Sequence, residues 1–155
     1  MAKYTVSDVK KLREETDAGM MDCKKALEEA AGNYARAVEL VHKQGLAKAD
    51  KKADRETKEG YIAAYVHGNG KVAALVELLC ETDFVALNED FKTVAKEIAM
   101  QVAAMAPETS EELLAQETIK RAGVTVEVMI KELSGKVGEK VSLGRFKRMM
   151  LGETT

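Results

Sequence analysis

Cysteine and histidine are scarce in this chain of 155 residues. Its two cysteines, Cys23 and Cys80, lie in different predicted elements and form no C-x-x-C motif, so neither a zinc site nor a disulfide framework is supported. The two histidines, His42 and His67, do not converge with them in the sequence. Because a hydrolase or a thiol enzyme needs such a constellation, we predict a protein that is not an enzyme and has no cofactor.

The chain also lacks an excess of charge of one sign and a long apolar run. It has 24 Lys and Arg against 26 Asp and Glu, and so no broad basic surface of the kind that binds nucleic acid. The longest uncharged run, from Gly60 to Gly70, is too short to cross a bilayer, and the start Met-Ala-Lys-Tyr-Thr has no apolar signal region. We expect a soluble cytoplasmic protein with neither membrane nor nucleic-acid partners.

Residues 1–45 are predicted to form a bundle of three short helices, separated by glycines and capping residues. The expected helices are Thr5–Glu15, Met20–Ala31 and Tyr34–Gly45. The first begins with a capping box, because Asp8 follows the N-cap Thr5 by three positions. Residues 46–59 lose the apolar stripe and become highly charged, which indicates a solvated helix or a linker.

Residues 60–155 are predicted to form an α+β domain, a three-stranded antiparallel sheet with helices on one face. Two segments rich in Val, Ile, Tyr and Leu flank the hairpin sequence Gly68-Asn69-Gly70, and the tail alternates like a third strand. The expected strands are Tyr61–His67, Lys71–Cys80 and Lys140–Leu151. The expected helices are one that Asn88 caps and Pro107 ends, one over Glu111–Arg121, and Val126–Val137 with Thr125 as its cap.

Two short segments carry apolar residues that could face a partner. Met20 and Met21 follow Gly19 at a tight corner, where at least one flexible side chain is expected outside the bundle and suits an irregular apolar groove. The alternative is that both pack inward. After the second strand, Thr82 and Asp83 could cap a helical turn while Phe84 fills the core, or Phe84 could project from the surface. The residues alone leave both questions open.

Two long stretches, Leu12–Leu27 and Glu77–Ala86, resemble the paired signatures of elongation factor Ts from bacteria and organelles. The ending Val137–Phe146 is similar to the family's Ile-Gly-Glu-Asn segment and the Arg-containing strand that follows it. The chain departs from the family pattern at three positions, which are Asp17 in place of glycine, Leu79 in place of asparagine and Leu87 in place of a basic or polar residue.

The resemblance implies a ubiquitin-associated-like fold for the first three helices, and guanine nucleotide exchange on elongation factor Tu during translation elongation, without covalent chemistry. The implied contact residues are Arg13, Met20 and Met21 in the first signature, and Thr82, Asp83, Phe84 and Val85 in the second. In the family, the second segment protrudes against the GTPase domain of elongation factor Tu, and its Phe wedges near the magnesium and phosphate site. The first group would grip a helix of the same GTPase.

Many members of that family also carry a second core subdomain and a coiled coil, for which this chain is too short. It therefore resembles the first half of these proteins, or the short forms that dimerise. An unpaired edge or an apolar face of the sheet predicts a two-fold homodimer through residues 60–155. The alternative function is a plain interaction module, in which the three-helix bundle binds a ubiquitin-like or helical partner and the sheet domain is a scaffold.

Overall fold

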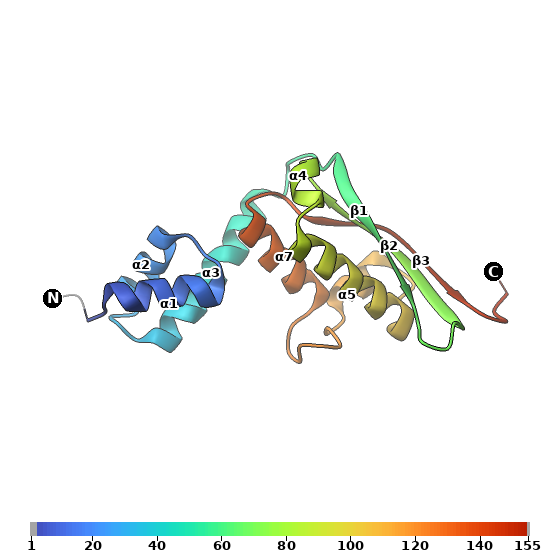
Figure 1. Ribbon diagram of the computed structural model, residues 1–155, viewed down its shortest axis with the longest axis horizontal. Coiled ribbons are helices and arrows are strands. Elements are labelled where there is room, and N and C mark those ends of the chain that lie inside the picture. Colours follow the sequence, from blue (N-terminus) through green and yellow to red (C-terminus); the bar gives the residue numbers. More distant parts are fainter. Residues whose placement is uncertain (1–2, 155) are drawn as a thin grey trace.

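Three helices form the N-terminal part of the molecule, at the left of Figure 1. The computed structural model describes residues 3–154; these helices are α1 (Val6–Thr16), α2 (Met20–Glu29) and α3 (Tyr34–Lys51). The predicted capping box is present, because the Thr5 hydroxyl accepts the Asp8 N–H and the Asp8 carboxylate accepts the Thr5 N–H. The inward faces bury a small core made of Val9, Leu12, Cys23, Ala26, Leu27, Ala30, Ala37 and Val41.

Helix α3 is longer than the sequence indicated. The expected end at Gly45 was wrong, because the helix continues through this glycine to Lys51. Gly45 lies against α7 (Val126–Val137), where a Cβ added to Gly135 would be 3.3 Å from the Gly45 carbonyl oxygen. A glycine inside a helix is unfavourable by about 1 kcal/mol relative to alanine. Here it has a packing role, since two facing glycines let the helices approach closely.

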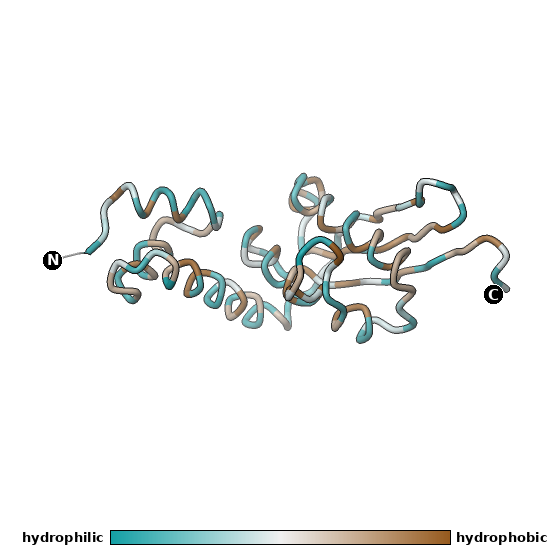
Figure 2. Tube along the Cα trace, turned by 90° about the horizontal axis from the view of Figure 1, so that it is seen from below, coloured by the Kyte–Doolittle hydropathy of each residue, from teal (hydrophilic) through white to brown (hydrophobic). Residues whose placement is uncertain are grey.

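The second part of the molecule contains a three-stranded antiparallel sheet of order β1-β2-β3. The strands are β1 (Glu59–Val66), β2 (Val72–Cys80) and β3 (Ser142–Met150). The predicted hairpin and the predicted tail strand are both confirmed, and an irregularity between Val76 and Leu78 shifts the pairing of β2 with β3. Figure 2 shows teal and brown alternating along the helices, as amphipathic elements require.

Helices cover one face of this sheet (Figure 1), so the predicted α+β class is confirmed. Helix α5 (Glu89–Met105) packs on all three strands, and Asn88 caps it by accepting the N–H groups of Asp90 and Phe91. Helix α7 packs against α5 on one side and against α3 on the other. Within residues 3–154, no helix is both long and apolar enough to cross a membrane.

The segment after α5 differs from the prediction. Only Ser110–Ala115 is helical (α6), and the remainder of the expected helix Glu111–Arg121 leaves the helical conformation at Gln116. The cause is the side chain of Gln101 in α5, which is 2% exposed. Its amide donates to the Glu117 carbonyl and accepts the Ile119 N–H. Because a buried amide must be paired, this loop is held in an extended form.

The opposite face of the sheet is exposed, and it carries apolar side chains together with the charged Glu77, Arg145 and Lys147. Its outward side chains include Ile62, Val66, Leu75 and Met149, which are between 51% and 74% exposed. The strand register places Leu75, on the central strand, between Ala64 and Lys147. An uncovered sheet face of this kind commonly marks a contact surface.

Candidate partner-binding site

A four-residue helix, α4 (Asp83–Ala86), follows β2 directly and presents Phe84 to solvent. The Phe84 side chain is 84% exposed, whereas Val85 and Ala86 of the same helix are 6% and 7% exposed and pack into the core. The interpretation in which Phe84 fills the core was therefore wrong. Leu87 lies three positions after Phe84, on the same side of the turn, and is 68% exposed.

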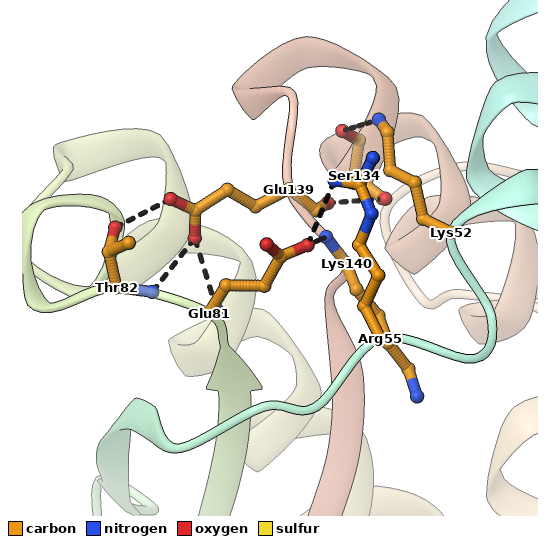
Figure 3. A network of polar contacts seen from close by, with 7 residues as sticks. All are labelled: Lys52, Arg55, Glu81, Thr82, Ser134, Glu139 and Lys140. Carbon is orange, nitrogen blue, oxygen red and sulfur yellow. Dashed lines mark hydrogen bonds and ion pairs between the residues drawn. The ribbon is translucent and has the colours of Figure 1, made fainter.

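The start of α4 is held by a carboxylate from a distant segment. The Glu139 side chain accepts the backbone N–H groups of Glu81 and Thr82, each at 3.0 Å. It also accepts the Thr82 hydroxyl proton, and that hydroxyl oxygen in turn accepts the Val85 N–H as the N-cap. Figure 3 shows this carboxylate directed at the end of β2. Four backbone and side-chain groups thus fix the orientation of a single helical turn.

A second layer of polar contacts holds this cap in place (Figure 3). The Glu81 carboxylate accepts the Lys140 N–H at 2.7 Å and pairs with the Arg55 guanidinium at 3.2 Å. The Lys140 N–H is the main cause of a lowered pKa for the Glu81 carboxyl, so this group is charged at neutral pH. On the other side, the Ser134 hydroxyl donates to the Glu139 carbonyl at 2.6 Å.

Cys80 contributes a packing contact and not a reactive group. Its thiol is buried and donates to the Thr82 carbonyl at 3.1 Å. Burial raises the pKa of the Cys80 thiol to about 11, so the thiolate that a nucleophile requires is not formed near neutral pH. Among the described residues, no group of three or more Cys, His, Asp and Glu side chains is arranged to hold a metal ion.

The residues of the first signature lie at the corner between α1 and α2. Arg13 and Met20 line the same shallow hollow. Met20 is 41% exposed and Met21 is 61% exposed, so the expectation that at least one methionine stays outside the bundle is confirmed. This corner belongs to the three-helix part, whereas Phe84 lies on α4, beside the sheet. The structure therefore places the members of each predicted group close to one another. The two groups lie on different parts of the molecule (Figure 1).

Sequence reasoning did not single out Glu139, although this residue determines how Phe84 is presented. The available signal was the segment Val137–Phe146, which resembles a family motif that contains a glutamate. Arg55 was also not singled out, since it lies in a highly charged stretch where many basic residues look alike.

Comparison with known proteins identifies the family. The family model described as elongation factor TS matches residues 81–155, which include α4 and Glu139. Elongation factor Ts of Fervidobacterium nodosum is 43% identical, over 94% of this chain and 96% of its own length. The protein of the same name from Desulforamulus reducens is 41% identical, over 99% and 91%. The chain belongs to the elongation factor Ts family.

Family members differ in length, and this chain is a short form. The alignment with the Fervidobacterium nodosum protein spans 190 positions, more than the 155 residues of this chain, so that relative has internal residues with no counterpart here. Elongation factor Ts of Methylococcus capsulatus is 51% identical over 94% of this chain, but the match covers only 49% of that protein.

Proposed function

We propose that this chain releases GDP from elongation factor Tu in protein biosynthesis, as a guanine nucleotide exchange factor without covalent chemistry. The observation that carries the proposal is the exposure of Phe84. Its side chain is 84% exposed, on a helical turn whose other side packs into the core. Phe84 and Leu87, which is 68% exposed on the same side of the turn, together form an apolar patch of the kind that marks a contact surface. Membership of the elongation factor Ts family supports the same conclusion.

The physical requirement is a difference in affinity. An exchange factor accelerates release because it binds the nucleotide-free GTPase more tightly than the GDP-bound form. GDP is held by a phosphate cradle and a magnesium ion, so a side chain that displaces the backbone beside them weakens GDP binding. Phe84 is the wedge, and Asp83 is its polar neighbour. Val85, being buried, anchors the wedge from within.

Rigidity of the wedge matters, because a side chain that yields on contact cannot displace the partner. The Glu139 carboxylate holds the cap residue Thr82 by two hydrogen bonds, and Val85 and Ala86 fix the opposite side of α4 in the core. Preorganisation of this kind removes the cost of ordering the segment on binding. An interaction module that acted through the bundle alone would have no use for it.

The corner of Arg13, Met20 and Met21 is the proposed docking surface for a helix of elongation factor Tu. We propose that the three helices form a ubiquitin-associated-like domain over residues 1–45, joined through 46–59 to the core domain at 60–155. The two hydrophobic clusters share no residue, which supports this division. Because the two contact surfaces belong to one chain, binding through one surface raises the effective concentration of the other at the partner. The cytoplasm, where translation takes place, is the proposed location.

We also propose a two-fold homodimer through the apolar face of the sheet. Two such faces can pack as a sandwich about 10 Å thick, and a self-complementary contact suits two-fold symmetry. The exposed Ile62, Val66, Leu75 and Met149 would form its centre. Helix α5 lies on the opposite face of the sheet, so dimerisation through this face would leave Phe84 and the methionine corner free.

Competition between ligands tests the exchange function. Elongation factor Tu freed of nucleotide and mixed with this protein is expected to elute as a complex from a sizing column, and excess GDP is expected to dissociate it. Linkage requires this reciprocity, because a factor that weakens GDP binding must itself be weakened by GDP. A complex that GDP leaves intact would contradict the proposal.

A further inference from the structure

One lysine joins the two parts of the molecule. Lys136 is in the last turn of α7, and its ammonium lies 2.8 Å from Oδ2 of Asp17 and 3.0 Å from Oδ2 of Asp90. Asp17 ends α1, three positions before Met20, whereas Asp90 is in the first turn of α5. The cation therefore connects the corner of the bundle to the core. The hydrogen bond to Asp17 is the largest cause of a raised pKa for Lys136.

The backbone of Asp17 has a conformation that favours glycine. Its φ is 54° and its ψ is 16°, in the left-handed region, which is unfavourable for residues that have a Cβ and is occupied most easily by glycine. The side chain that this chain carries instead is the one that reaches Lys136. A strained position is thus occupied by a group with a specific partner in the other part of the molecule.

The remainder of the junction is a close crossing of two helices. Helices α3 and α7 meet at Gly45 and Gly135 and pack along their length. Two further polar contacts span the same crossing, Lys131 with Asp50 at 3.1 Å and Lys52 with the Ser134 carbonyl at 3.3 Å. Beside the crossing is a cleft of about 530 Å³ between the bundle and the core, and Lys136 is among its lining residues. Rotation about the glycine contact would open or close this cleft and would stretch the Lys136 contacts.

The same end of α7 also holds the wedge. Glu139 follows Lys136 by three residues and carries the hydrogen bonds that orient α4. The residue that joins the methionine corner to the core and the residue that orients the wedge therefore lie three positions apart, at the end of α7.

We propose that Lys136 is a positioning residue, which with Asp17 and Asp90 sets the angle between bundle and core and hence the spacing between the Met20-Met21 corner and Phe84. The inference rests on the proposed function, in which both surfaces engage one elongation factor Tu. Binding through two linked surfaces depends steeply on whether their spacing matches the partner. A loosened junction leaves each surface intact but lowers the chance that both engage together.

The test compares Asp17→Asn, Lys136→Met and the double variant in the full chain. Each single variant is expected to lower kcat/KM for GDP exchange by about three- to tenfold. The double variant should lose no more than the more affected single one, because Lys136→Met already removes the contact that Asp17→Asn breaks. A spin label or dye pair at Lys25→Cys and Glu111→Cys, both exposed positions, should report a broader distance distribution in the same variants. Lys136→Arg is expected to retain both properties.

The variant Asp17→Gly distinguishes an effect on the angle between bundle and core from an effect on stability. Glycine relieves the left-handed backbone, so the melting temperature is expected to stay level or rise while exchange falls. If the losses of exchange activity in the two single variants add up in the double variant, Asp17 contacts the partner directly, and the proposal is overturned. An unchanged distance distribution, or full exchange activity in all variants, would overturn it equally. Phe84→Ala provides the separate check, because its failure to affect exchange would count against the proposed function itself.

Discussion

Thr82 and Glu139 are joined by two hydrogen bonds across 57 residues of sequence, one from the Thr82 backbone N–H at 3.0 Å and one from its hydroxyl. A helix of four residues has no stability of its own, because helix nucleation is unfavourable. The turn that carries Phe84 therefore depends on a group from the end of α7. In the proposed exchange mechanism, the direction of the wedge is determined far from the wedge in sequence.

Replacement of Glu139 tests this dependence. Glu139→Ala leaves the N–H groups of Glu81 and Thr82 without their acceptor, and the loss of these bonds is expected to lower the free energy of unfolding by about 1–3 kcal/mol. At temperatures where the variant is still fully folded, its lower stability cannot reduce GDP exchange. Exchange is nevertheless expected to be slower there, because the cap that orients Phe84 is lost. Glu111→Ala, at an exposed position on α6, is the matched control. A folded Glu139→Ala protein with wild-type exchange would show that the cap does not matter.

The methionine corner gives a second prediction. Arg13→Ala, Met20→Ala and Met21→Ala are each expected to weaken binding to nucleotide-free elongation factor Tu several-fold, because truncating an interface anchor commonly costs more than about 1 kcal/mol. Calorimetric or interferometric titration would measure the affinities. Lys25→Ala, exposed on the same helix α2, should bind like the wild type. Unchanged affinity in all three variants would move the docking surface elsewhere.

Local signals predicted most of the fold. The capping box at Thr5, the caps Asn88 and Thr125, and the stop at Gly138 all act within one turn of the chain, and each was visible in the sequence. The two errors arose where tertiary contacts override local preference. Gly45 looked like a helix end but is where α7 approaches, and the end of α6 is decided by a buried amide from α5.

The site was predictable only in part. Whether Phe84 or its neighbours face the core depends on which side of a single turn is buried, and the small apolar residues Val85 and Ala86 fill that place. The pattern of residues allows both arrangements, so the resemblance to a known family was needed to favour the exposed ring. The role of Glu139 depends on the return of the chain after α7, which no local pattern contains.

Acid titration provides a third prediction, for the ion pair of Glu77 with Arg145. The Arg145 guanidinium, and then its backbone N–H, lower the pKa of Glu77 from 4.5 to about 2. Because the pKa is lower in the folded state, this contribution to stability is fully present above about pH 4.5 and is lost as the pH falls to about 2. Thermal melts across this range should show a weaker pH dependence for Glu77→Gln than for the wild type. An identical pH dependence of the melting temperature in the two proteins would contradict this prediction.

The proposed dimer predicts that a substitution in the sheet face lowers the molecular mass measured in solution. Leu75 is 51% exposed at the centre of the apolar sheet face, so Leu75→Asp should leave the fold intact but place a charge in the contact between sheets. Light scattering at micromolar concentration is expected to give twice the chain mass of 16.9 kDa for the wild type and the single mass for the variant. A wild-type mass of 16.9 kDa that persists on concentration would show that the chain acts as a monomer.

The wedge is tested most directly by release of a fluorescent GDP from elongation factor Tu, with wild type and Phe84→Ala compared at equal concentration. The wild type should accelerate release, and the variant should be at least tenfold slower with an unchanged melting temperature, since the ring is 84% exposed. Val85→Ala, at a buried position, should instead lower the free energy of unfolding by about 1–3 kcal/mol. Release at the wild-type rate by Phe84→Ala would contradict the account.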